Sequence, residues 1–300
     1  MKRFLMLTFC AVAGGFSVSA NAQDRSLQQG RSLELQGQDK ETRQVWEAGI
    51  AGRNSRVAAL NLELARSYSL ESDWISAAAY AELSFKSQRP KKPADWVNIA
   101  NLFELGGKQE QFDALIVAYA AQKNLADLDH IKTRLNMLGP NVFEDQQALV
   151  RIADKVAKNR RKNAWYLVVQ GATNFRAKNY QRAEQQLTTF ARSTASDGWV
   201  DALRHYWMAM TLMKLNKKED AREWLRKGEA LSRSNPSRPS WVNDYKFIPE
   251  LELLRREAFQ QVTGEHPPEL PSLHKNRAPR RTSVTKPGVL RSSLPTGLSK

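Results

Sequence analysis

The sequence predicts an all-α protein in which about five helical hairpins stack into a right-handed solenoid with a C-terminal capping helix. One observation is a recurring spacing, in which a small residue is followed nine positions later by an aromatic or polar residue and three positions after that by another small residue. Small residues allow two antiparallel helices to touch, and the large residue fills the turn between them. The copies are Ala65/Trp74/Ala77, Gly171/Tyr180/Ala183 and the weaker Ala209/Lys218/Ala221.

A second observation is the period at which these hairpins recur. Recurrence near 35 residues is typical of arrays of helical hairpins, each of which packs on its neighbours. An irregular helical bundle is the alternative, because it would contain the same helices without a common register. The residues that open the second helix of each hairpin are Ala77, Phe112, Ala148, Ala183 and Ala221, at intervals of 35, 36, 35 and 38 residues.

Two hairpins depart from the pattern. Within Ala94–Tyr119, Phe112 occupies a position that should hold a small residue, so this hairpin should splay or repack. In the next copy Asn136 occupies the first small position, and Gly139-Pro140 should end the first helix early. That copy is kept because the ranges on either side of the turn have the periodicity of amphipathic helices. These ranges are Leu128–Leu138 and Glu144–Lys158.

The C-terminal hairpins are expected over Asn163–Arg192 and Ala202–Ser232. A further helix, about Pro249–Val262, carries apolar residues at helical spacing. The end of a solenoid needs a cover for its last hydrophobic face, and this helix is predicted to supply it. The apolar residues are Leu251, Leu254, Ala258 and Val262.

The last two hairpins resemble the tetratricopeptide repeat family through Trp165, Gly171, Tyr180 and Ala183. The stretch Trp199–Val262 is similar to tetratricopeptide modules at the C-terminal end of some large bacterial Ser/Thr kinases. The resemblance covers roughly residues 60–262 and no kinase domain, because the sequence has neither a Gly-rich loop after a strand nor the His-Arg-Asp and Asp-Phe-Gly motifs.

The resemblance implies a concave groove, lined by the first helices of the hairpins, that binds a partner peptide or helix. The family's two-carboxylate clamp needs a basic residue four positions before the groove asparagine, and here Val97 precedes Asn101, which argues against binding of chaperone tails. Because Arg176 should face this groove, Arg176→Ala is expected to leave the fold intact. The implied groove residues are Leu62, Arg66, Val97, Asn101, Glu104, Val168, Ala172, Phe175, Arg176, Tyr206, Met210 and Lys214.

The N-terminus has the pattern of a signal peptide. Lys2 and Arg3 precede the apolar run Phe4–Val18, which at about 15 residues is shorter than the roughly 20 that span a bilayer. Ala20-Asn21-Ala22 then provides a cleavage site. A short buried helix is the alternative. Cleavage would also remove Cys10, the only cysteine, which excludes disulfides and cysteine-ligated zinc from the mature chain.

Composition divides the rest of the chain. Residues 23–44 are polar and are expected to form a flexible leader, with a charged helix over Asp24–Gly37 as the alternative. Residues 264–300 contain six prolines and seven basic against two acidic residues, so they are expected to form a disordered basic tail. The predicted organisation is a signal peptide over 1–22, the leader over 23–44, the solenoid over 45–263 and the tail over 264–300.

No catalytic or cofactor motif is present in the sequence. It lacks a P-loop, a dinucleotide-binding loop, a nucleophile elbow and a His-Glu-x-x-His zinc helix. The histidines lie apart and without a carboxylate at ligand spacing, so we expect no metal and no cofactor. These histidines are His130, His205, His266 and His274.

The sequence thus predicts an exported, non-enzymatic adaptor that binds a protein or peptide partner and has no transmembrane segment after signal cleavage. The net charge of +15 supports an alternative, in which the basic tail and patches attach the protein to an anionic polymer or lipid head groups of the cell envelope. Charge alone would also fit nucleic acid, but the export signal argues against it.

Overall fold

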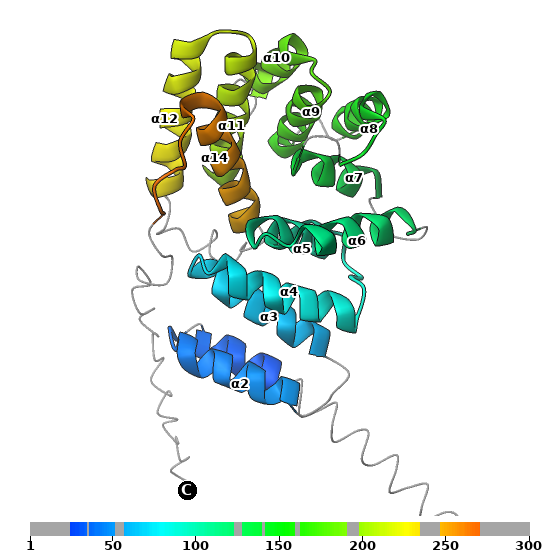
Figure 1. Ribbon diagram of the computed structural model, residues 1–300, viewed down its shortest axis with the longest axis vertical. Helices are drawn as coiled ribbons and strands as arrows, with labels where there is room; N and C mark the ends of the chain where they lie inside the picture. The colour runs from blue at the N-terminus through cyan, green and yellow to red at the C-terminus, as the bar shows by residue number, and fades with distance from the viewer. Residues whose placement is uncertain are drawn as a thin grey trace, which may run out of the picture.

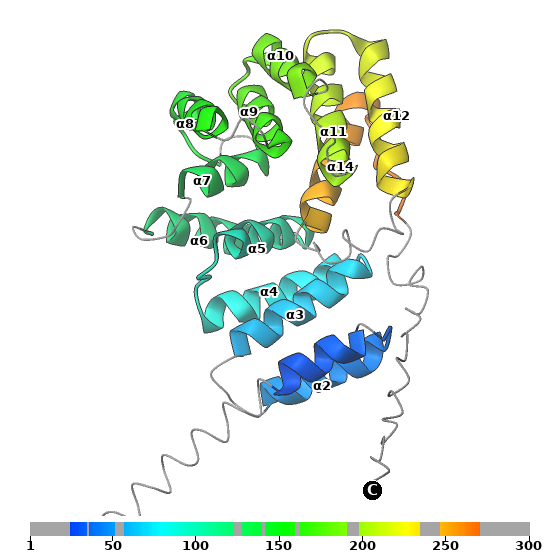
Figure 2. The same ribbon diagram turned by 180° about the vertical axis from the view of Figure 1, so that it is seen from behind.

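The computed structural model describes residues 25–34, 36–51, 57–122, 128–139, 142–159, 163–190, 198–234 and 247–270. All regular secondary structure in these ranges is helical, and successive helices pack on their neighbours along the chain (Figures 1 and 2). The prediction of an all-α fold made of stacked hairpins is therefore confirmed. The residues predicted to form a signal peptide and residues 271–300 of the predicted tail lie outside the described residues.

Each of the five expected hairpins is present. The helix pairs are α3 (Val57–Leu70) with α4 (Trp74–Ser87), α5 (Pro93–Leu105) with α6 (Gln109–Ala120), α7 (Leu128–Met137) with α8 (Gln146–Asn159), α9 (Ala164–Arg176) with α10 (Tyr180–Phe190), and α11 (Gly198–Lys214) with α12 (Lys218–Ser234). The early end of α7 at Met137 agrees with the break expected at Gly139-Pro140.

An additional hairpin precedes these five, where a flexible leader was predicted. Residues 25–34 are helical and pair with α2 (Asp39–Ala51), so the prediction of a flexible leader is wrong and the charged-helix alternative describes this region better. Gly30 lies against the fully buried indole of Trp46, because a Cβ atom at position 30 would come within 2.0 Å of the Trp46 Nε1 atom. A small residue thus lies against a large one between the two helices of the first hairpin, as Gly171 lies against Leu187 later in the chain.

The repeat register is visible in the backbone of the turns. A residue with positive φ follows the first helix in five of the hairpins, at Gly37, Ser72, Gly107, Lys178 and Asn216. The amide of the next residue donates to the carbonyl five residues back, for example from Lys108 N to Phe103 O at 2.8 Å. This geometry closes the C-terminus of a helix and reverses the chain. The repeat prediction therefore extends to the conformation of individual turns.

Small residues lie where paired helices meet. Ala65, Ala77, Ala183 and Ala221 are fully buried, and a Cβ atom on Gly171 would come within 2.6 Å of Leu187. The α5/α6 hairpin differs as expected, since its two helices contact each other over much less of their length than α3 and α4 do. The buried ring of Phe112 takes the place of a small residue there.

The C-terminal helix α14 (Ile248–Thr263) is present and buries the four predicted apolar residues. It packs on the last hairpin, α11 and α12, as a cap should. It also contacts α5 and, more weakly, α3, which belong to hairpins far earlier in the sequence. In Figure 1 it runs beside α11 toward α5. The helix is therefore more than a cover for the end of the solenoid, because it also covers part of the face formed by the first helices.

Candidate functional site

Most of the residues predicted to line the groove are covered. Leu62 and Glu104 are half-buried, and Lys214 is exposed. The remaining nine are buried, so the face made by the first helices is not an open groove along its whole length. The buried residues are Arg66, Val97, Asn101, Val168, Ala172, Phe175, Arg176, Tyr206 and Met210.

Helix α14 is attached to the middle of this face by two ion pairs. The Arg176 guanidinium donates to both carboxylate oxygens of Glu257, at 2.5 and 2.6 Å, and also to the backbone oxygen of Met137 at 2.6 Å. Arg134 on α7 forms an ion pair with Glu250, and both of these side chains are buried. The glutamates lie seven residues apart, which places them on one side of the helix.

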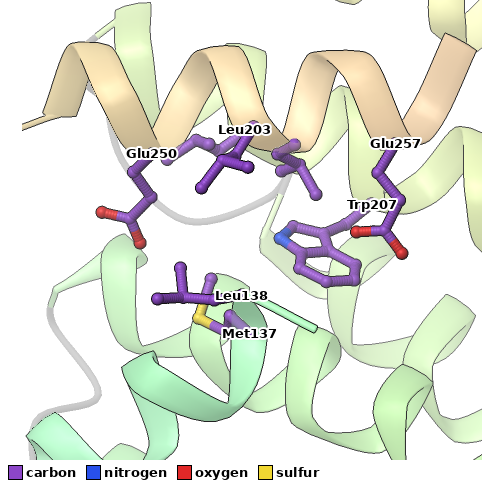
Figure 3. A pocket seen from close by; sticks show the side chains of 8 residues that line it. Met137, Leu138, Leu203, Trp207, Glu250 and Glu257 are labelled. Atoms are coloured by element: carbon purple, nitrogen blue, oxygen red, sulfur yellow. The ribbon is translucent and has the colours of Figure 1, made fainter. Parts of the chain in front are cut away.

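Apolar side chains fill the space between these pairs. Met137 and Leu138 at the end of α7 face Leu203 and Trp207 of α11 and the α14 side chains (Figure 3). They enclose a cavity of only about 10 Å³, roughly the space of one water molecule. The middle of the concave face is therefore packed as a protein interior and leaves no room for a peptide beside α14.

A third charged cluster joins α14 to α12. Arg255, whose side chain is fully buried, contacts the two carboxylate oxygens of Glu229 at 2.7 and 2.9 Å and Glu252 at 3.2 Å. Burial opposes ionisation of Glu229, but the hydrogen bonds and charge of Arg255 outweigh it and hold the pKa of Glu229 below its usual value. Arg255 also donates to the backbone oxygen of Pro268, which fixes the start of the segment after α14 on this helix.

Arg66, another predicted groove residue, is engaged at the N-terminal end of the array. It forms an ion pair with Glu34. It forms a second ion pair with Glu63, in which Nε of Arg66 lies 2.8 Å from the Glu63 carboxylate. Its guanidinium also lies 5.7 Å from the centre of the Trp46 ring. The first hairpin is attached to α3 in this way, so Arg66 serves the fold.

One part of the predicted groove remains open, between α3, the α4–α5 connection and the start of α5. This α3–α5 pocket has a volume of about 290 Å³. Its apolar wall includes the side chains of Leu62 and Ile99. Its rim carries Arg89, Lys91 and Lys92, which form no ion pair with any residue that the structure describes. The pocket thus combines an apolar wall with an excess of positive charge, because its basic lining residues outnumber the acidic ones, Glu63 and Asp95.

The described residues provide no metal site. They contain no group of three or more histidine, cysteine or acidic side chains that could hold a metal ion. His205 lies with Nδ1 2.5 Å from the backbone oxygen of Asp201, and burial lowers the pKa of its imidazole. His130 instead packs beside the ring of Tyr166. Each of these histidines is therefore engaged within its own part of the helical array.

Within the described ranges, no helix has the length and apolar composition needed to cross a membrane. The geometry defines the class of protein as an all-α stack of helical hairpins with its own C-terminal helix packed on the inner face. Comparison with known proteins does not narrow this class, because no family model and no curated protein matches the chain.

Sequence reasoning missed the residues that attach α14. Arg134 lies outside the inner-face positions that the family resemblance implies, and Glu250 and Glu257 lie on a helix that was assigned only an apolar role. The seven-residue spacing of the two glutamates was the available signal. It indicates a charged stripe beside the apolar one, and such a stripe on a buried helix requires basic partners.

Proposed function

We propose that this chain is a non-enzymatic scaffold of the tetratricopeptide type that binds a segment of another protein in the α3–α5 pocket. The observation that carries the proposal is the division of the concave face. Helix α14 fills its middle and C-terminal part, whereas the N-terminal part keeps an open pocket of about 290 Å³. Helical-repeat arrays present extended concave surfaces of this kind to other chains.

The chemistry of the pocket indicates what the partner segment carries. The half-buried Leu62 offers an apolar surface for a partner side chain, with the buried Ile99 behind it, and Ala58 and Ala59 leave space beside Leu62. The rim cations Arg89, Lys91 and Lys92 favour carboxylates around that apolar contact. The partner is therefore an acidic segment with one or two large apolar residues.

The proposal includes export of the protein before it binds its partner. Its support is the ordered signal-peptide pattern of the first 22 residues, together with the lack of catalytic motifs in the sequence. A partner in the cell envelope or outside the cell follows from this part of the proposal.

The test is photo-crosslinking in cells from position 62, with a photoreactive amino acid in place of Leu62. The control places the same amino acid at Ile75, which is 76 % exposed on α4 of the same hairpin but outside the pocket. We expect an adduct from position 62 that contains an acidic protein segment, and none of that composition from position 75. We also expect the combined substitution Lys91→Glu and Lys92→Glu to weaken the adduct.

Two outcomes would contradict the proposal. Equal adducts from positions 62 and 75 would show that the pocket does not select a partner. An adduct with lipid or polysaccharide instead of protein would favour the electrostatic alternative, in which the rim cations contribute to attachment to an anionic envelope surface.

A further inference from the structure

Helix α6 leaves a second opening in the array. Phe112 occupies the small-residue position of this hairpin, and its buried ring keeps α6 from closing on α5 as α4 closes on α3. The result is a cavity of about 520 Å³ between α6, the end of α5 and the end of α7. We name it the α6 slot. It lies beside the base of α14, because Leu138 lines both the α6 slot and the small cavity under α14.

The walls of the α6 slot include apolar side chains of α6 and of the α7–α8 connection, which the two neighbouring hairpins leave partly uncovered. Ile116, Leu138 and Val142 are half-buried, and Val117 is 71 % exposed. Two consecutive hairpins of a helical array normally bury such residues against each other. An apolar surface that remains uncovered in this way indicates a binding site.

The charge of the α6 slot is opposite to that of the whole chain. Its charged lining residues are Glu104 and Asp113, and neither of them forms an ion pair with any residue in the described part of the chain. Gln109 donates a hydrogen bond of 3.0 Å to Asp113. Burial, together with the nearby charge of Asp113, raises the pKa of Glu104. A cation placed here would relieve the repulsion between the two carboxylates.

Several acidic residues elsewhere in the described part of the chain are paired with cations. On α12, Glu219 pairs with Arg222, and Glu223 pairs with Arg226 and Lys227. In a chain with a net charge of +15, carboxylates without a basic neighbour stand out. A basic segment should therefore bind more favourably at the α6 slot than at the paired acidic residues of α12.

We propose that the α6 slot binds the segment Lys286-Pro287-Gly288-Val289-Leu290-Arg291 of the same chain. This segment places a cation on each side of two apolar residues, which matches a slot with apolar walls and two carboxylates. The segment and the α6 slot are therefore complementary in charge and in the placement of apolar residues.

The length of chain is sufficient for this contact. The described residues end at Leu270, sixteen residues before Lys286. An extended chain spans about 3.3 Å per residue, so sixteen residues reach about 50 Å. The start of this connection is fixed on α14 by the hydrogen bond from Arg255 to Pro268, and Leu138 lines both the cavity under α14 and the α6 slot.

The test is zero-length carbodiimide coupling of the full chain followed by mass spectrometry. This reagent joins a carboxylate to a lysine amine only where the two are in contact. We expect a cross-link between Lys286 and Asp113 or Glu104. The substitution Asp113→Asn, with Glu104→Gln, should abolish that product. Glu110→Gln is the matched control, because Glu110 is exposed on the same helix but does not line the slot, and it should leave the cross-link yield unchanged.

A second measurement does not depend on the coupling chemistry. Hydrogen exchange of the α6 amides should be slower in the native chain than in a Leu290→Asp variant, by up to about five-fold if the contact is worth as much as a good exposed pair. Raising the salt to about 1 M, where the screening length is about 3 Å, should reduce the difference.

Three outcomes would overturn the proposal. The first is coupling of Lys286 to the carboxylates of α12 as often as to those of the slot. The second is identical α6 exchange in the native and Leu290→Asp chains. The third is a Lys286 cross-link found only between differently labelled copies in a mixture, which would assign the occupant to a second molecule.

Discussion

At the scale of single residues, Arg176 shows most clearly how far a position in a repeat can be predicted. Arg176 was predicted to face the groove, and in the structure it is buried because Glu257, 81 residues later in the chain, pairs with it. The position of a residue within the repeat indicates which way its side chain points. It contains no information about which later part of the chain covers that side chain. For the same reason Arg134 and Glu250 could not be paired from the sequence.

The substitution Arg176→Ala should therefore destabilise the protein, contrary to the expectation from the sequence. It would leave Glu257, whose side chain is 25 % exposed, and the Met137 carbonyl without their donor, and leaving such groups unsatisfied costs about 1–3 kcal/mol. Arg182→Ala is the control, because its pair with Asp154 is exposed and should contribute at most about 1 kcal/mol. Urea unfolding at neutral pH measures both, and equal midpoints for the two variants would contradict this account.

The contact between α9 and α10 gives a second prediction at this scale. Ala183 is fully buried where the two helices meet, so Ala183→Trp forces them apart and should cost about 1–3 kcal/mol or more. Gln185→Trp places the same side chain on an exposed position of α10 and should leave stability nearly unchanged. Thermal melts followed by circular dichroism distinguish the two, and a larger loss for Gln185→Trp would refute the register.

Glu229 makes the free energy of unfolding depend on pH in the acidic range. Its folded-state pKa lies below the usual value of 4.5 because Arg255 favours the carboxylate. The stabilisation is complete above that usual value and is lost as the pH falls through the lower folded value. We expect the native protein to lose more stability than Glu229→Gln between about pH 5 and about pH 2. Parallel urea midpoints for the two proteins over this range would show that Glu229 is not the linked group.

At the scale of elements, the turns were the most predictable feature, because each is determined by residues close in sequence. Lys178 adopts a φ of 62° where Gly107 adopts 67° in the equivalent turn. The left-handed conformation costs a residue with a side chain about 1–2 kcal/mol, partly offset by the entropy of glycine in the unfolded chain. We expect Lys178→Gly to stabilise the protein by about 1 kcal/mol, and Gly107→Lys to destabilise it.

The control for this pair is Lys217→Gly, since Lys217 follows the left-handed residue of its own turn and does not itself have a positive φ. It should gain no stability. A stabilisation of Lys217→Gly equal to that of Lys178→Gly would mean that the backbone conformation of the turn is not the cause.

The first hairpin is the element that the sequence prediction missed. Its polar composition suggested a flexible leader, yet Gly30 and Thr42 have the same twelve-residue separation as Ala65 and Ala77. Thr42 also precedes Ala77 by 35 residues, in register with the rest. Composition was misleading here because the ion pairs of Glu34 with Arg66 and of Arg31 with Glu63, together with the buried Trp46, replace a large apolar core.

At the scale of the whole molecule, the stacking of hairpins follows from local sequence, but the use of the inner face does not. The position of α14 depends on contacts with α5, α7 and α9 that are 80 or more residues away. Local periodicity predicts that α14 is a helix with one buried side. It cannot reveal which earlier helices receive that side, so the open pocket could be located only in the folded structure.

The most direct test of this arrangement is a charge exchange between α9 and α14. We predict that Arg176→Glu and Glu257→Arg each lower the free energy of unfolding, and that the double variant recovers part of the loss, with a coupling free energy of about 1–3 kcal/mol. Recovery would show that α14 lies on the inner face against α9. If the two losses instead add to within about 0.5 kcal/mol, the two residues are not neighbours, and the division of the concave face on which the proposed function depends is wrong.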